Sequence, residues 1–244
     1  MHSGWVSSAG LELTTQSPRM SSGLDGLAAV DKTVAAKLLL ARTILLAPPE
    51  LQPVEVTVID PKSDTDFDYL EGLDRFHRGD AAPTGLEIFF QEFRNRQKKD
   101  DTGRNLKILF VDEFASLINL IDDKKDKEVA QRNLSILLML SRSFRCSIQL
   151  ATQQPSAQAM GNSGNREQFG VVCLLGDSGS ETQQMLFDAD SRETMKKYGS
   201  IGGRSVGWLS HNGGIAQPVR VPCVNDMQKL NKIILSNLEG VQKQ

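Results

Sequence analysis

The chain has 244 residues, 39% of them hydrophobic, and a formal net charge of -2 at pH 7. This length can bury one sizeable α/β core, so we expect one domain. The near-neutral charge excludes a global field that attracts nucleic acid, although a local basic surface is compatible with it. Apolar runs are shorter than the roughly 18 residues that cross a bilayer, and the N-terminus does not read as a secretory signal. The chain as given is therefore expected to be cytosolic.

The three cysteines, Cys146, Cys173 and Cys223, are far apart in the sequence and odd in number. Two of them lie in apolar runs that resemble strands or strand edges. These features favour reduced, buried thiols over a disulfide framework.

The first folded element is predicted to be a helix at residues 33–47, after a leader at residues 1–31. The leader is rich in Ser, Gly and Thr without sustained periodicity, which is typical of a disordered or poorly specified segment. The helix is apolar all round apart from Lys37 and Arg42, as expected of a helix packed between a sheet and other helices. We expect one domain at residues 32–238 and a short tail at residues 239–244.

Strand-like and helix-like segments alternate along the rest of the chain. The strands are expected at residues 54–59, 106–111, 147–151 and 169–175, and the helices at residues 84–96 and 128–144. The mixed charge run at residues 122–128 is expected to be a solvated loop. Alternation predicts an α/β fold with a mostly parallel sheet flanked by helices. Residues 204–210 and 217–221 flank the turn HNGG and predict a C-terminal antiparallel hairpin at a sheet edge, followed by a helix at residues 226–238.

Polar residues follow three of the predicted strands. They are Asp60, then Asp112 with Glu113, then Thr152 with Gln153. Because ligands of open parallel sheets bind at the carboxyl ends of strands, we expect these residues to converge. An aspartate placed after apolar residues can hold Mg²⁺, and an adjacent glutamate can polarise a water for attack on a γ-phosphate. The alternative is that acidic residues commonly end strands before a turn.

Gln153 is a candidate sensor of the γ-phosphate or of the attacking water. The alternative is a glutamine that caps the turn before Pro155. If Gln153 is considered alone, the capping role is favoured. If it lies beside the acidic pair on a parallel sheet, the sensor role is favoured.

Residues 26–33, GLAAVDKT, partly match the phosphate-binding loop Gly-x-x-x-x-Gly-Lys-Ser/Thr. Gly26, Lys32, Thr33 and the following helix fit, but Asp31 replaces the second glycine and no apolar strand precedes the loop. A non-glycine residue at positive φ costs about 1 to 2 kcal/mol. A carboxylate about 5 Å from a phosphate adds on the order of 3 kcal/mol of repulsion. Micromolar binding is worth only about 8 kcal/mol, so the loop is expected to bind ATP weakly unless Mg²⁺ bridges the clash.

From Lys32 onward the order of motifs resembles the motor domain of the FtsK/SpoIIIE family of DNA translocases, a group of HerA/FtsK-like P-loop ATPases. Relatives carried by conjugative elements of Gram-positive bacteria are particularly similar. The blocks that carry this resemblance are VTVIDPKSDTDFDYL, KILFVDEFASL, LSRSFRCSIQLATQQPSA, FGVVCLLGDSGSETQQMLFD and GGRSVGW. The resemblance extends over about five-sixths of the chain and fails only before Lys32.

The resemblance implies a RecA-like P-loop NTPase domain that uses ATP and Mg²⁺ and assembles as a homo-hexameric ring around double-stranded DNA. It places Lys32 and Thr33 on phosphate and Mg²⁺ contacts, and Asp112 and Glu113 on the Walker B roles. It places Gln153 on the sensor.

Three further segments are candidates for contacts outside this set. Arg142 is a candidate for reaching the nucleotide of a neighbouring subunit, and a salt bridge on a helix end is an equal alternative. Arg204 is a weaker candidate for the same role. The polar loop at residues 158–166 could contact DNA in the ring channel, although its glycines and asparagines also suit a flexible connection.

Three functions follow as hypotheses. The first is an ATP-driven double-stranded DNA translocase for conjugation or for chromosome partition at cell division. The second is a catalytically inactive ring component or adaptor with a degenerate phosphate loop at Asp31, and the third is an ATPase that moves protein or RNA. The family places other domains before this one, often with membrane helices, which would hold the chain to a membrane-bound transfer or division apparatus at the inner face of the membrane. One explanation of the abrupt start of the match is a coding sequence truncated or frame-shifted upstream of Lys32.

Overall fold

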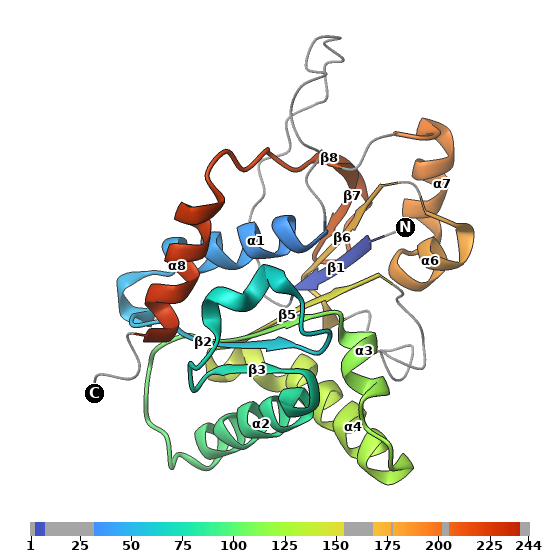
Figure 1. The fold of residues 1–244 in the computed structure, drawn as a ribbon. Coiled ribbons are helices and arrows are strands. Elements are labelled where there is room, and N and C mark those ends of the chain that lie inside the picture. The colour runs from blue at the N-terminus through green and yellow to red at the C-terminus, as the bar shows by residue number, and fades with distance from the viewer. Residues whose placement is uncertain (1–2, 8–31, 154–167, 177, 202–204, 240–244) are drawn as a thin grey trace.

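The computed structural model describes residues 3–7, 32–153, 168–176, 178–201 and 205–239. In these residues one sheet has the strand order β3-β2-β4-β5-β1-β6-β7-β8 (Figure 1). The strands are β1 Ser3–Ser7, β2 Glu55–Asp60, β3 Phe76–Arg78, β4 Lys107–Asp112, β5 Cys146–Thr152, β6 Val171–Leu175, β7 Val206–His211 and β8 Gln217–Arg220.

The sheet has a parallel half and an antiparallel half. Strands β3, β2, β4 and β5 are parallel neighbours, whereas β6, β7 and β8 pair in antiparallel fashion. The hairpin of β7 and β8 forms the outer edge, as the sequence predicted. Its turn uses left-handed backbone at Asn212 and Gly213, which an asparagine and a glycine tolerate well.

Strand β1 joins the two halves and lies antiparallel to both β5 and β6. No regular element was predicted before Lys32, and the rest of the leader lies outside the described residues. Because β1 runs opposite to β5, its last residue, Ser7, pairs with Gln149 and its second residue, Gly4, pairs with Thr152 at the carboxyl end of β5. Lys32 lies at that carboxyl end, beside Asp112. Strand β1 therefore does not lead directly into the helix that begins at Lys32, as the strand of a phosphate-binding loop does.

Helices cover both faces of the sheet and enclose two apolar cores (Figure 1). Helices α1 (Lys32–Leu46) and α8 (Met227–Glu239) pack together on one face, and α2 (Ala82–Lys98), α3 (Phe114–Asn119) and α4 (Lys124–Leu140) lie on the other. Helices α6 (Ser180–Leu186) and α7 (Ala189–Tyr198) pack beside the antiparallel strands. Along β4, Ile108 and Phe110 enter the core of α1 and α8, while Leu109 and Val111 enter the other core. Because helices cover both faces of the sheet, consecutive residues of these strands are apolar instead of alternating with polar ones.

The predicted helices and strands are found within a few residues of their expected positions, with one correction. The charge run at residues 122–128 was expected to be a loop, but α4 already begins at Lys124. The Asp123 side chain caps this helix by accepting hydrogen bonds from the backbone N–H groups of Lys125 and Asp126, at 2.8 and 3.1 Å. The last predicted turn of the helix is instead a 3-10 helix, Ser141–Phe144.

Short elements were missed by the sequence analysis. They are β3, α3, α7 and the 3-10 helices Pro49–Leu51, Thr65–Leu70 and Gly79–Ala81. Of the cysteines, Cys146 and Cys173 are buried free thiols as expected, whereas Cys223 is exposed, which corrects the prediction for that residue. Among the described residues, none of the helices is long and apolar enough to span a bilayer.

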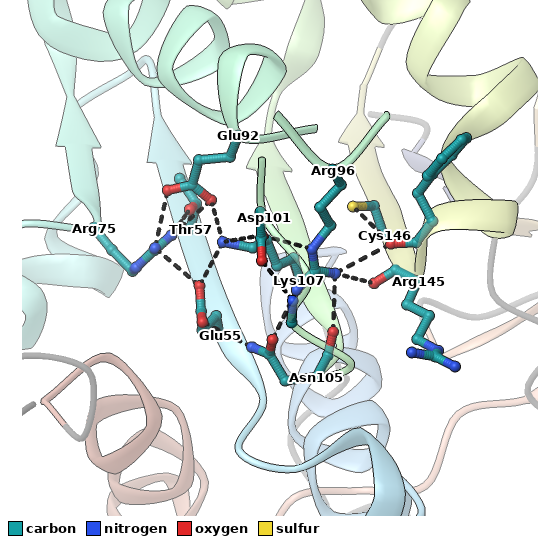
Figure 2. Close-up of polar contacts among 12 residues, drawn as sticks. Glu55, Thr57, Arg75, Glu92, Arg96, Asp101, Asn105, Lys107, Arg145 and Cys146 are labelled. Atoms are coloured by element: carbon teal, nitrogen blue, oxygen red, sulfur yellow. Dashed lines mark hydrogen bonds and ion pairs between the residues drawn. The ribbon is translucent and has the colours of Figure 1, made fainter. Parts of the chain in front are cut away.

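Charged residues at the amino ends of the parallel strands tie α2 to the sheet (Figure 2). We call this group the amino-edge network; its members are Glu55, Arg75, Glu92, Arg96, Asp101, Asn105 and Lys107. The Lys107 Nζ lies 2.8 Å from Glu55 and 3.0 Å from Glu92, and Arg75 pairs with the same two acids.

Arg96 is the most connected member of the amino-edge network. Its guanidinium donates to Asp101 at 2.9 Å, to Asn105 and to the backbone carbonyls of Phe144 and Arg145. Figure 2 shows these donors reaching from α2 to the loop before β4 and to the start of β5. The network therefore fixes the helix layer against the strand starts.

Candidate nucleotide-binding site

The predicted site residues lie at the carboxyl ends of three neighbouring strands. Strands β2, β4 and β5 pair in parallel, with Ile59 opposite Val111 and Asp112 opposite Ala151. This register brings Asp60, Asp112 and Thr152 to the same edge of the sheet. The sequence predicted this convergence from the polar residue that follows each apolar run.

The start of α1 supplies the cation of the site. The Lys32 Nζ lies 3.0 Å from Asp112 Oδ1 and 3.4 Å from Glu113 Oε2, and all three side chains are buried. The neighbouring Thr33 hydroxyl donates to Asp112 Oδ2 at 3.4 Å. The structure thus joins the lysine and hydroxyl of the candidate phosphate loop to the acidic pair of β4.

Glu113 adopts left-handed backbone, with φ 64° and ψ 67°, between the end of β4 and the start of α3. Such a conformation is unfavourable for a residue other than glycine and costs of the order of 1 kcal/mol or more. It directs the carboxylate toward β5, where Oε1 accepts the Thr152 hydroxyl at 2.8 Å and the Gln153 N–H at 3.0 Å. Strain of this kind is common at functional positions.

A second lysine also reaches Glu113. The Lys62 Nζ lies 3.3 Å from Glu113 Oε2, which Lys32 approaches too. Burial works to raise the pKa of the Glu113 carboxyl, but Lys32, the Gln153 N–H, the Thr152 hydroxyl and Lys62 outweigh burial and lower it. Glu113 is therefore held as a carboxylate. We call the group Lys32, Thr33, Lys62, Asp112, Glu113, Thr152 and Gln153 the carboxyl-edge cluster.

The two aspartates at this edge respond differently from Glu113. Burial raises the pKa of Asp112, and Lys32 offsets only part of that rise. Burial also raises the pKa of Asp60 to about 6, despite backbone N–H donors from Asp64 and Lys62 and the nearby Arg78. Burial thus disfavours the charged form of both aspartates, and a bound divalent cation would favour it.

Not every predicted residue joins the cluster. Gln153 contributes its backbone N–H, while its side chain is exposed. Arg142 is exposed in the 3-10 helix before β5, at the opposite edge of the sheet, so it does not contact this cluster within one chain. Gly26, Asp31, Arg204 and the loop at residues 158–166 lie outside the described residues, and their predicted roles stay predictions.

The sequence assigned no role to two members of the cluster. Thr152 was expected at this edge without a function, and Lys62 appeared only within the block VTVIDPKSDTDFDYL. The position of Lys62, two residues after the end of β2, was the available signal, because β2 lies beside β4 in the sheet.

The residues present fit a magnesium triphosphate in chemical type. A threonine hydroxyl and a carboxylate, Thr33 and Asp112, are hard oxygen ligands of the kind that Mg²⁺ prefers. Lys32 and Lys62 supply positive charge for phosphate, and Glu113 supplies a carboxylate beside them. The buried acid whose pKa is raised by desolvation, Asp112, is the group that a bound cation would stabilise.

No protein-family profile and no curated protein matches this chain. Among solved structures, the conjugation coupling protein TcpA of pCW3, in a monomer form with ATPγS, aligns with a TM-score of 0.58 and 18% identity. The cytoplasmic domain of the Thermomonospora curvata type VII secretion ATPase EccC aligns with a TM-score of 0.55 and 14% identity.

These alignments include most of this chain but only part of each solved structure. The TcpA match covers 84% of this chain and 63% of the TcpA chain, and the EccC match covers 85% of this chain and 27% of the EccC chain. At these identities the likeness concerns the fold. The chain has the RecA-like fold of P-loop ATPases, as the order of its motifs predicted.

Proposed function

We propose that this chain is the motor domain of an ATP-dependent double-stranded DNA translocase that serves conjugative DNA transfer or chromosome segregation. The observation that supports this most strongly is the convergence of Lys32, Thr33, Asp112 and Glu113 at one edge of the sheet. These residues come from two elements far apart in the sequence, and each has the side chain that its proposed role requires. The solved structures of similar fold are a conjugation coupling protein and a type VII secretion ATPase, and the first of these supports the choice of conjugation.

In this proposal the chain binds MgATP at the carboxyl edge. Lys32 binds phosphate oxygens, and Thr33 and Asp112 hold the Mg²⁺, which neutralises charge on the phosphates when bound. Glu113 orients and polarises the attacking water, and its lowered pKa keeps it ionised for that task at neutral pH. Gln153 follows β5 at the same edge and is proposed as the sensor of the terminal phosphate.

Arg142 is proposed to act on a neighbouring copy. It lies at the amino edge, opposite to the site of its own chain, and is exposed. In a head-to-tail ring, one edge of each subunit faces the other edge of the next. This arrangement would let Arg142 approach a neighbour's nucleotide, as the family resemblance implies for a homo-hexamer.

The direct test is ATP hydrolysis without nucleic acid and with double-stranded DNA, single-stranded DNA or RNA. We expect double-stranded DNA to stimulate hydrolysis most, and Glu113→Gln to abolish it. Glu128→Gln, an exposed glutamate of α4, is the matched control and should retain full activity. Hydrolysis unaffected by Glu113→Gln would refute the site. Hydrolysis that depends on Glu113 but is not stimulated by any nucleic acid would support the ATPase activity and contradict the DNA cargo. It would favour a protein translocase instead.

A second candidate function is an inactive ring component or adaptor. The direction of β1 favours it, because this strand does not lead into Lys32 as a phosphate-loop strand does. Calorimetry with MgATPγS separates the two functions. Micromolar affinity would exclude the inactive form, whereas weak binding that Asp31→Gly restores would locate the fault in the loop.

A further inference from the structure

Two lysines from different elements approach the same oxygen of Glu113. Lys32 of α1 lies 3.4 Å and Lys62 of the loop after β2 lies 3.3 Å from Oε2. The other oxygen, Oε1, accepts the Thr152 hydroxyl, and the Gln153 N–H donates to both oxygens at 3.0 Å. Glu113 therefore has donors on both oxygens, and two like charges meet at one of them. This is a favourable arrangement only while an anion lies between the lysines.

The donors of Glu113 differ in how easily they can leave. Lys32 is 6% exposed, and the Thr152 and Gln153 donors belong to the end of β5. Lys62, in contrast, is 40% exposed. A long, flexible, partly solvated side chain whose ion pair is with Glu113 can change partners at little cost.

The backbone below Lys62 is fixed, so that only the side chain is free to move. The Asp60 carboxylate accepts the N–H groups of Lys62 and Asp64, at 3.2 and 2.8 Å. Farther along the loop, the buried Lys37 of α1 donates to the Asp66 carbonyl and lies 4.8 Å from the centre of the Phe67 ring. The loop is thus anchored to both β2 and α1, next to the start of α1 where a phosphate is proposed to bind.

We propose that Lys62 is a second phosphate-binding cation of this site, which exchanges the Glu113 carboxylate for the terminal phosphate of a bound nucleoside triphosphate. The inference rests on the proposed function. Lys62 leaves Oε2 for the terminal phosphate, while Glu113 keeps Lys32, Thr152 and Gln153 as partners. The side of Oε2 that Lys62 occupied then becomes open to water. Lys62 thereby couples the presence of a terminal phosphate to the availability of Glu113.

The test is calorimetric binding of MgATPγS and MgADP to the full chain and to Lys62→Gln. Because Lys62 serves the terminal phosphate, we expect the affinity for MgATPγS to fall roughly tenfold or more. The affinity for MgADP should stay within about twofold, since MgADP lacks that group. Lys62→Arg keeps the charge and should recover most of the MgATPγS affinity. Lys124→Gln, an exposed lysine of α4, is the matched control and should bind both nucleotides as the unmodified chain does.

The outcomes separate this inference from the proposed function. Equal losses for both nucleotides, or no loss for either, would overturn the role of Lys62 while leaving nucleotide binding intact. Failure of the unmodified chain to bind either nucleotide would overturn the proposed function, and the role of Lys62 with it. Thermal unfolding of each variant guards against misfolding. If Lys62→Gln does not fold, Lys62→Ala takes its place: a selective loss of MgATPγS affinity is again expected, and an unchanged ratio of MgATPγS to MgADP affinity would refute the exchange.

Discussion

The parallel strands carry charged residues at both ends, and the two groups differ in how their charges are satisfied. In the amino-edge network three cations, Arg75, Arg96 and Lys107, meet three acids at short distances. There Glu55 and Asp101 have lowered pKa values, because the paired cations outweigh the effect of burial. At the carboxyl edge, burial raises the pKa values of Asp60 and Asp112.

This difference separates a structural network from a candidate ligand site. The amino-edge network is complete by itself, since it joins α2 to the strand starts through mutual pairs and backbone carbonyls. The carboxyl-edge cluster leaves acid under-compensated and places two lysines on one oxygen. Substitutions at the first edge should therefore cost stability, and substitutions at the second should cost ligand binding and chemistry.

The largest effect is expected for Glu113→Gln. Loss of the carboxylate removes the group that polarises water, so the rate of ATP hydrolysis should fall by about 100-fold or more. The amide oxygen of the substituted side chain can still accept the Thr152 and Gln153 donors, and the buried Lys32 keeps its pair with Asp112, so the unfolding midpoint should change by only a few degrees. Steady-state hydrolysis and thermal unfolding measure the two quantities. A large loss of stability would show that the carboxyl edge is structural as well, and would contradict the distinction between the two edges.

Arg96→Ala should give the opposite result. The Arg96 side chain is 3% exposed and pairs with Asp101 while binding two carbonyls from the start of β5. Removing one partner of a buried pair costs about 3 to 5 kcal/mol, so urea unfolding should show a loss of that size. Nucleotide affinity of the folded fraction should not change. Arg94→Ala, on the exposed face of α2, is the control and should cost under about 1 kcal/mol.

The pH dependence of stability should differ in sign between the two edges. Folding raises the pKa of Asp60 from 3.8 to about 6, so its charge destabilises the fold as pH rises through 4 to 6. Asp60→Asn should thus cost most in acid and least at neutral pH. Folding lowers the pKa of Glu55 below 4.5, so its contribution is complete above that pH and is lost in acid. Glu55→Gln should reduce the free energy of unfolding most at neutral pH. A loss of unfolding free energy that changes with pH in the same direction for both variants between pH 4 and 7 would contradict this contrast.

The smallest effect concerns thiol labelling. Cys146 lies beside the amino-edge network, and burial raises its pKa to about 11, so it should react slowly with iodoacetamide at pH 8 while the exposed Cys223 reacts readily. Arg96→Ala should accelerate labelling of Cys146 by increasing local opening, whereas Glu113→Gln should not. Mass spectrometry of the labelled peptides measures both rates. If Arg96→Ala and Glu113→Gln accelerate labelling of Cys146 equally, a substitution at the carboxyl edge also destabilises the amino edge, and the two edges are not independent.

Local patterns in the sequence determined the alternation of strands and helices, because buried parallel strands are apolar on both faces and are followed by polar residues. They also placed Asp112 and Glu113 at a strand end and identified the hairpin. Local patterns failed for α4, whose start depends on one capping residue, Asp123, and for β3, whose three residues pair only because β2 lies beside them.

The contacts that give the acidic pair its properties were decided by the tertiary structure alone. Lys32 and Lys62 reach Glu113 across 81 and 51 residues, and Thr152 reaches it across 39. The antiparallel direction of β1 and the amino-edge network are equally long-range. Periodicity reports which face of an element is buried, but partners and strand direction depend on how distant elements pack. The sequence thus determined the fold class and the acidic pair, and packing decided which cations the pair holds.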